Sequence, residues 1–234
     1  MNKIKEFFKG ELAGWKSWEV IWLFLGSFLV TFVSFYLGDD LIGICAALTG
    51  ILCVICTGKG KLSAYIFGTI NVVLYAIIAL NARYYGEVML NLLYFLPLEF
   101  YGFYVWFKNI NPETNEVYKF RLSNKNRILL FVIVALMTII YGYILSVLNG
   151  SLPYVDALST VISVVAMIIS IKMYMEQWIL WIIIDVVTVI MWVFALFNGT
   201  GSIAILLMWS VYLINAIIMY FKWKKESERR YNEI

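Results

Sequence analysis

One stretch decides the fold: Tyr174-Met-Glu-Gln-Trp-Ile-Leu-Trp-Ile-Ile-Ile-Asp-Val-Val-Thr-Val-Ile-Met-Trp192. Its apolar length predicts a helix that crosses a membrane. Trp178, Trp181 and Asp185 occupy positions i, i+3 and i+7 of that helix, and therefore lie on one face. A carboxylate at the centre of a bilayer costs about 3 kcal/mol on insertion scales, so it must face a polar interior. The stripe predicts that this helix lines the path of a small aromatic, cationic solute.

The composition of the whole chain is typical of polytopic membrane proteins. Of its 234 residues, 63% are hydrophobic and only 14% are charged. Soluble domains are about 45–50% apolar and about 25% charged, so this chain could not cover its apolar surface in water. We expect an all-α integral membrane protein that is surrounded by the lipid bilayer and has no nucleic-acid partner.

Eight apolar segments follow an N-terminal stretch, residues 1–18, whose lysines indicate an interfacial helix. Most segments are close to the roughly 20 residues that cross about 30 Å of hydrocarbon. They are 19–37, 41–57, 62–80, 84–107, 128–148, 154–171, 177–197 and 201–222. The long polar connection 108–127 divides the chain near its middle.

The basic residues predict the orientation. With a cytoplasmic N-terminus, eight spans place all but one of the 18 lysine and arginine residues on the cytoplasmic side, and the exception is Arg83. This bias follows the positive-inside rule. We therefore expect a multi-pass protein of the cytoplasmic (inner) cell membrane, with both the N- and the C-terminus in the cytoplasm.

The chain contains an internal repeat. Shifting the sequence by 114 residues places Ile70-Asn-Val-Val73 on Ile184-Asp-Val-Val187, and spans two to four then superpose on spans six to eight. Two triplets of the same orientation need one helix between them, and the fifth span supplies it. This predicts a parallel 3+1+3 repeat, as in the SWEET sugar carriers, with span one as an addition. The predicted parts are 1–40, the repeat 41–107, the loop and linker helix 108–153, the repeat 154–222, and a cytoplasmic tail 223–234.

Polar residues within the spans are the candidate substrate contacts. Asn71 and Asp185 are equivalent in the repeat, and such transporters bind substrate at the midplane between repeats. The structural alternative is interhelical hydrogen bonding, worth about 0.6 kcal/mol per pair on average. A tryptophan near a helix end, such as Trp178, is alternatively an interfacial anchor. The full candidate set is Trp178, Trp181, Asp185, Asn71, Gln177, Asn215 and Asn91.

No catalytic residue, metal site or cofactor is expected. Cys53 and Cys56 form a CxxC pair, but the chain has no histidine and no second pair to complete a zinc site. These cysteines are therefore interpreted as small apolar packing residues. An intramembrane enzyme is also disfavoured, since no Ser-Lys pairing occurs at membrane depth.

Several motifs resemble the PnuC family of vitamin transporters, typified by nicotinamide riboside carriers. They are Tyr174-x-Glu-x-Trp-x-x-Trp-x-x-x-Asp185, Tyr65-Ile-Phe-Gly-Thr-Ile-Asn71, Tyr101-Gly-x-x-x-Trp106 and Ser163-Val-Val-Ala-Met167. The resemblance implies a SWEET-like fold, a homotrimer, and facilitated diffusion of nicotinamide riboside. Relatives often carry Asn in place of Asp185, and similar proteins are thought to carry thiamine or flavins, so another vitamin is the alternative substrate.

The chemistry of nicotinamide riboside agrees with the candidate residues. Tryptophan faces attract a cationic pyridinium ring by about 0.5–2 kcal/mol. Amide side chains such as Asn71, Gln177 and Asn215 can bond the carboxamide and the hydroxyl groups, and an ionised Asp185 offsets the positive charge. A proton-coupled carrier that uses Asp185 or Glu99 is the mechanistic alternative.

Overall fold

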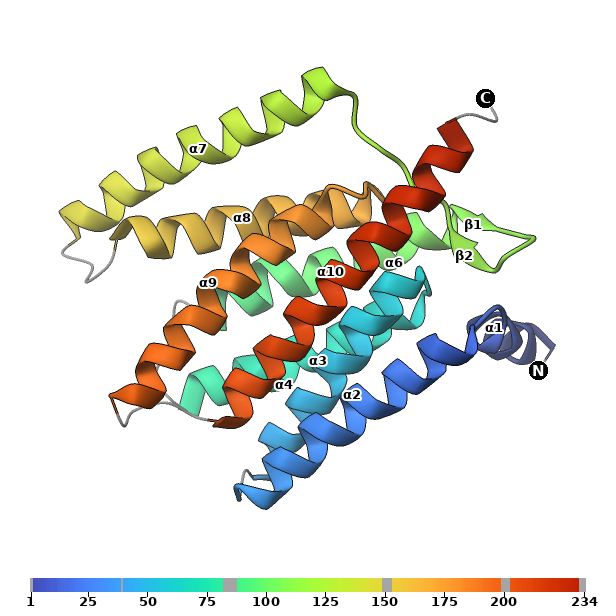
Figure 1. Cartoon of the computed structure of the whole chain (residues 1–234), viewed down its shortest axis with the longest axis horizontal. Helices are drawn as coiled ribbons and strands as arrows, with labels where there is room; N and C mark the ends of the chain where they lie inside the picture. Colours follow the sequence, from blue (N-terminus) through green and yellow to red (C-terminus); the bar gives the residue numbers. More distant parts are fainter. Residues whose placement is uncertain (1, 39, 82–87, 149–152, 199–202, 232–234) are drawn as a thin grey trace. The chain divides into compact units, whose positions relative to one another are not determined.

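The computed structural model describes residues 2–38, 40–81, 88–148, 153–198 and 203–231. These residues are almost entirely helical, which confirms the all-α membrane class (Figure 1). The elements are α1 (Asn2–Leu12), α2 (Ser17–Tyr36), α3 (Leu41–Lys59), α4 (Ser63–Asn81), the π-helix η1 (Leu90–Phe95), α6 (Leu96–Phe107), β1 (Ile110–Asn111), β2 (Glu116–Val117), α7 (Asn124–Val147), α8 (Pro153–Ile171), α9 (Gln177–Phe197) and α10 (Ile203–Tyr231).

The chain folds as two compact units, which are described separately below. Unit 1 comprises Met1–Tyr118 and Val189–Asn215, and unit 2 comprises Lys119–Thr188 and Ala216–Ile234. The helices α9 and α10 are each divided between the two units, α9 after Thr188 and α10 after Asn215.

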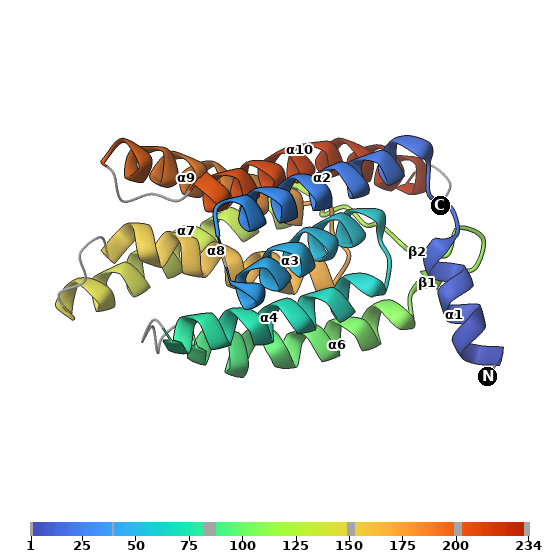
Figure 2. The same ribbon diagram turned by 90° about the horizontal axis from the view of Figure 1, so that it is seen from below.

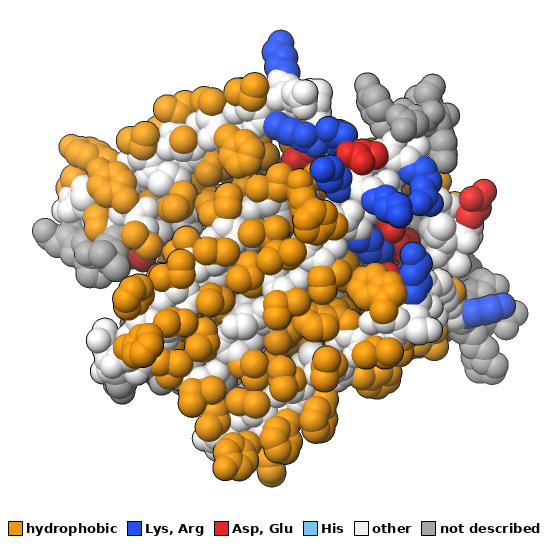
Figure 3. All heavy atoms as spheres, viewed as in Figure 1, with side chains coloured by type: hydrophobic (Ala, Val, Ile, Leu, Met, Phe, Trp, Pro, Cys, Tyr) orange, Lys and Arg blue, Asp and Glu red, His pale blue; other side chains and the backbone are white. Residues whose placement is uncertain are grey.

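In unit 1, α3 packs against both α2 and α4, and α4 packs against α6 (Figure 2). Val30, Ile51, Ile55 and Val211 form a buried apolar core at the α2–α3 contact. Gly26 faces this core, and a Cβ there would make ordinary van der Waals contacts of 3.5–3.6 Å with Val211, Ile51 and Ile55. The opposite face of α2 carries exposed phenylalanines, and Figure 3 shows hydrophobic side chains along this helix. That distribution is typical of a helix that faces lipid on one side.

The ends of α3 follow from its terminal residues. Asp40 caps its N-terminus, because the side-chain Oδ1 accepts a hydrogen bond from the Gly43 N–H at 2.7 Å. Gly60 ends the helix in the left-handed conformation at φ 81°, which glycine adopts at little cost. The Gly60 carbonyl accepts the Val117 N–H, so the short β1–β2 hairpin is attached to the α3–α4 turn.

In unit 2, α7 and α8 lie side by side, as both ribbon views show (Figures 1 and 2). Gly142 on α7 allows the two helices to approach closely, since a Cβ at this position would clash with the ring of Tyr154. The α8–α9 turn contains Met173 at φ 61°, an uncommon conformation for a residue with a side chain. Phe120 fixes this turn by pairing its backbone with Met173 and Met175.

The predicted number of eight membrane spans is supported only in part. Seven helices within the described residues are long and apolar enough to cross a membrane. The predicted fourth span, 84–107, is helical from residue 88 onward but is divided between η1 and α6, and residues 84–87 lie outside the described part. Arg83, the basic residue expected on the outer side, also lies outside it. The eight-helix 3+1+3 arrangement stays a prediction.

Candidate functional site

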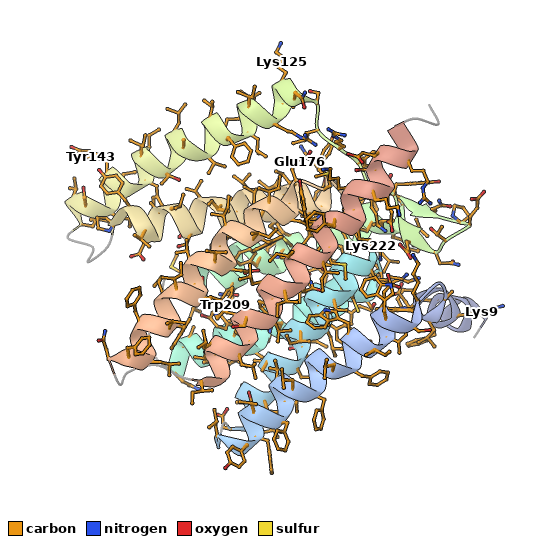
Figure 4. The ribbon with its side chains drawn as sticks, in the orientation of Figure 1. Lys9, Lys125, Tyr143, Glu176, Trp209 and Lys222 are labelled. Carbon is orange, nitrogen blue, oxygen red and sulfur yellow. The ribbon has the colours of Figure 1, made fainter. Side chains whose placement is uncertain are left out.

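The turn before α9 is anchored by the carboxylate of Glu176, which is labelled in Figure 4. Both of its oxygens accept the Leu122 N–H at 3.2 Å, and Oε1 also accepts from Arg127 Nε at 2.7 Å. Glu176 is almost fully buried, so these bonds form with little competition from water. The first turn of α9, which carries the tryptophan motif, therefore starts from a fixed point.

Gln177 and Trp178 place two unused polar atoms in the interior of unit 2. Gln177 is 0% exposed and Trp178 is 3% exposed. Gln177 Nε2 donates to the Tyr174 carbonyl at 3.2 Å, which leaves Oε1 as the free end of the amide. Within the described part of the chain, neither Gln177 Oε1 nor Trp178 Nε1 has a hydrogen-bond partner. An acceptor and a donor are thus both available to a bound molecule.

Asp185 lies two turns further along α9, at 3% exposure. Among the residues that the structure describes, no cation or hydrogen-bond donor contacts its carboxylate. Trp181 lies between Gln177 and Asp185 on the helix and is only partly buried. The predicted stripe is therefore present as a group of buried polar atoms beside a more accessible indole.

The remaining candidates belong to unit 1. Asn71 on α4 donates from Nδ2 to the Ala46 carbonyl of α3 at 2.7 Å. The Tyr212 hydroxyl reaches the same place, because a Cβ on Gly50 would meet both Tyr212 Oη and Asn71 Nδ2. The side chains of Asn71 and Tyr212 thus meet at Gly50 of α3. Tyr212 is therefore added to the candidate contacts. The sequence placed Tyr212 at helical spacing from Asn215 but offered no reason to choose it.

Asn215 uses both ends of its amide for bonds between helices of unit 1. Its Oδ1 accepts from Trp22 Nε1 at 3.2 Å, and its Nδ2 donates to the Val54 carbonyl at 3.1 Å. These bonds join α10 to α2 and α3. Such a role matches the structural alternative considered for intramembrane amides. A substrate contact at Asn215 therefore requires exchange of one of these bonds.

Asn91 lies on the π-helix η1 and is buried. The Leu96 N–H bonds to the Asn91 carbonyl, five residues earlier, where an α-helix would use the fourth. Pro97 explains this register, because it has no N–H to offer the carbonyl of Leu93. Local π-turns are frequent at functional sites, since they redirect the side chains that they carry.

Trp223 and Lys119 were missed by the sequence reasoning. Trp223 is 0% exposed, and its ring meets Trp178 edge to face, with centroids 5.8 Å apart and planes at 73°. Lys119 Nζ lies over the Trp223 ring, 5.6 Å from its centroid. Lys222 and Lys224 flank Trp223 and concealed it, because the segment after residue 222 is polar in composition.

Seven membrane-length helices among the described residues, together with the polar atoms buried in their interior, define a class of protein, the multi-pass membrane proteins with a polar interior. Residues 40–225 match the family model described as nicotinamide mononucleotide transporter. The chain is 40% identical to the nicotinamide riboside transporter PnuC of Neisseria mucosa over 95% of this chain and 87% of that one. It is 33% identical to the protein of the same name from Haemophilus influenzae, over 93% and 94% of the two chains.

A solved structure agrees with these sequence relatives. The crystal structure described as that of the vitamin B3 transporter PnuC superposes with a TM-score of 0.83 at 36% identity, covering 96% of this chain and 98% of the other. The chain belongs to the PnuC family. It is a membrane transporter and not an enzyme.

Proposed function

We propose that this chain mediates facilitated diffusion of nicotinamide riboside into the cell across the cytoplasmic membrane, with both termini in the cytoplasm. The names of its two relatives at 40% and 33% identity support this substrate. The observation that carries the proposal is the buried group on α9, where a donor and an acceptor lie beside two indoles and a carboxylate. The homotrimer implied by the family resemblance is part of the same proposal.

The nicotinamide part of nicotinamide riboside has suitable partners on α9. The pyridinium ring can stack on Trp178 or Trp181, a contact worth about 0.5–2 kcal/mol. Its positive charge is offset by Asp185, which has no other cation among the described residues. The carboxamide offers both an acceptor and a donor, which complement Trp178 Nε1 and Gln177 Oε1.

The predicted sequence repeat supports a substrate site at the midplane between the repeats. Asn71, Asn91 and Asn215, polar residues of the other predicted spans, stay proposed substrate contacts. Because Asn71 and Asn215 already bond to other helices, we expect the substrate to replace those bonds as it enters. Such an exchange costs little when each lost bond is replaced by one to the ligand.

Nicotinamide riboside is expected to quench the tryptophan fluorescence of the purified protein. Trp181→Ala should lose most of the affinity, roughly 10-fold or more, because the more accessible indole of the stripe is removed. Titration of both proteins with the vitamin measures this. Trp18→Ala removes an exposed tryptophan of α2 and is the matched control. Thiamine and riboflavin are tested in parallel, and binding of one of them without nicotinamide riboside would contradict the substrate assignment.

A proton-coupled carrier is the second candidate, and two buried carboxylates favour it. Asp185 and Glu99 both lie within apolar helices, and no ion pair joins either one to another described residue. Glu99 on α6 rests directly on Gly68 of α4, where a Cβ would lie 2.5 Å from its Oε2. Ionisable groups in such positions commonly bind the coupling proton of a transporter.

Uptake into proteoliposomes under a pH gradient separates the two candidates. Uniport predicts the same final internal concentration with and without the gradient. Coupling predicts accumulation that Asp185→Asn abolishes while exchange of internal for external vitamin continues. Asp156→Asn, a change to an exposed carboxylate in the first turn of α8, is the control.

A further inference from the structure

Trp178 is a buried indole that no hydrogen bond orients. Its Nε1 has no partner in the described part of the chain, so the plane of the ring is set by packing alone. An unbonded N–H at 3% exposure costs about 1–3 kcal/mol, and the ring gains free energy by turning toward any acceptor. A neighbouring group must therefore hold Trp178 in the orientation in which it meets a ligand.

Trp223 on α10 is that neighbour within unit 2. Its ring lies 5.8 Å from that of Trp178 at 73°, the edge-to-face geometry in which two aromatic rings attract each other. Trp223 is itself 0% exposed, so it has little freedom to move. A change in the tilt of one indole requires a change in the other.

Lys119 in turn fixes Trp223. Its ammonium lies over the Trp223 ring and pairs with Glu226, one helical turn further along α10. Lys119 is only 5% exposed, so the contact between the cation and the ring is largely shielded from water. The next residue, Phe120, bonds to Met173 and Met175 through its backbone at 2.9 Å, which holds Lys119 beside the α8–α9 turn.

We propose that Lys119 and Trp223 are positioning residues of the substrate site, and that they hold Trp178 for stacking on the flat ring of the substrate. This inference rests on the proposed function, because it takes Trp178 as a substrate contact. Neither residue touches the substrate. They act on the substrate indirectly: Lys119 contacts Trp223, Trp223 contacts Trp178, and each contact restricts the orientation of the next side chain.

The test measures the affinity for nicotinamide riboside together with the near-ultraviolet circular dichroism of the unliganded protein. Two neighbouring indoles give a coupled signal, and Trp178→Phe and Trp223→Phe each identify it by its loss. Lys119→Met should alter this signal and weaken binding on the order of 5-fold, the magnitude of a shielded cation–π contact. Lys119→Arg keeps a cation over the ring and should restore both.

Arg121→Met is the matched control. Arg121 joins the same loop to α10 through an ion pair with Glu228 at 3.2 Å, and among the described residues it lies over no indole ring. It should leave the affinity and the dichroism unchanged. Equal losses in Arg121→Met and Lys119→Met would overturn the inference, because general docking of the loop would then explain them. An unchanged dichroism in Lys119→Met would overturn it as well.

The two failures are distinguishable. If the wild-type protein binds no nicotinamide riboside, the proposed function fails, whereas the dichroism still tests the positioning of Trp178 without any ligand. If the wild type binds and Lys119→Met binds equally well, the inference fails and the proposed function stands.

Discussion

Lys59 is a lysine at the end of α3 whose ammonium is almost completely buried in unit 1. It contacts Glu19 at 2.6 Å, Glu116 at 2.7 Å and the Gly14 carbonyl at 2.5 Å. These partners lie on α2, on β2 and before α2, so one side chain joins three segments. A buried charge is tolerated only when it is paired and hydrogen-bonded in this way.

Removal of this ammonium should strongly destabilise unit 1. Lys59→Met leaves two carboxylates without their cation, and loss of one partner of a buried ion pair costs about 3–5 kcal/mol. Unfolding in mixed micelles measures the change in the free energy of unfolding. Lys9→Met, at an exposed lysine of α1, should have no effect, and an equal effect of both changes would contradict this account.

Some residues of the candidate site could be predicted from the sequence and others could not. The stripe of Trp178, Trp181 and Asp185 could be predicted, because helical spacing alone places these three residues on one face. The partners Trp223 and Lys119 could not, since they come from distant segments and only packing brings them to Trp178. Lys59 is similar: the basic pattern predicted only that it lies on the cytoplasmic side, and its burial depends on acidic residues far away in the chain.

At the scale of elements, the π-helix η1 is the local irregularity with the clearest cause. Pro97 removes one donor, and the preceding turn bonds to the fifth residue back. Pro97→Ala restores the donor and should let the segment relax to an α-helix, which turns Asn91 away from its present direction. If Asn91 contacts the substrate, uptake should fall roughly 10-fold, because small misplacements at a site are costly.

Uptake kinetics of Pro97→Ala against Pro153→Ala measure this effect. Pro153 is the first residue of α8, where proline fits without loss of a bond, and its replacement should be neutral. Wild-type uptake by Pro97→Ala would show that the π-turn does not place a substrate contact.

The bounds of most helices followed closely from hydropathy. Segment 177–197 coincides with α9, and 154–171 differs from α8 by one residue, because long apolar runs have few alternatives. The helix α10 differs most, since it continues past residue 222 to Tyr231. Hydropathy cannot find such an extension, in which buried Trp223 alternates with charged residues. The π-turn also escaped it, because a shift in hydrogen-bond register leaves no trace in composition.

At the scale of the whole molecule, the comparisons show the family, whereas the 3+1+3 repeat stays a prediction from the sequence. The family model covers residues 40–225, which begin one residue before the first predicted repeat and leave α2 wholly outside. The interpretation of span one as an addition to the repeat stays a prediction. Membership in the PnuC family shows a membrane transporter, whereas the equivalence of Asn71 and Asp185 stays a prediction from the sequence.

Uptake of labelled nicotinamide riboside by proteoliposomes, without any ion gradient, tests the central claim most directly. Facilitated diffusion predicts rapid entry until the internal concentration equals the external one, and no further accumulation. Thiamine and riboflavin should enter no faster than into protein-free liposomes. A lack of nicotinamide riboside entry, in protein that is folded by its near-ultraviolet dichroism, would contradict the account.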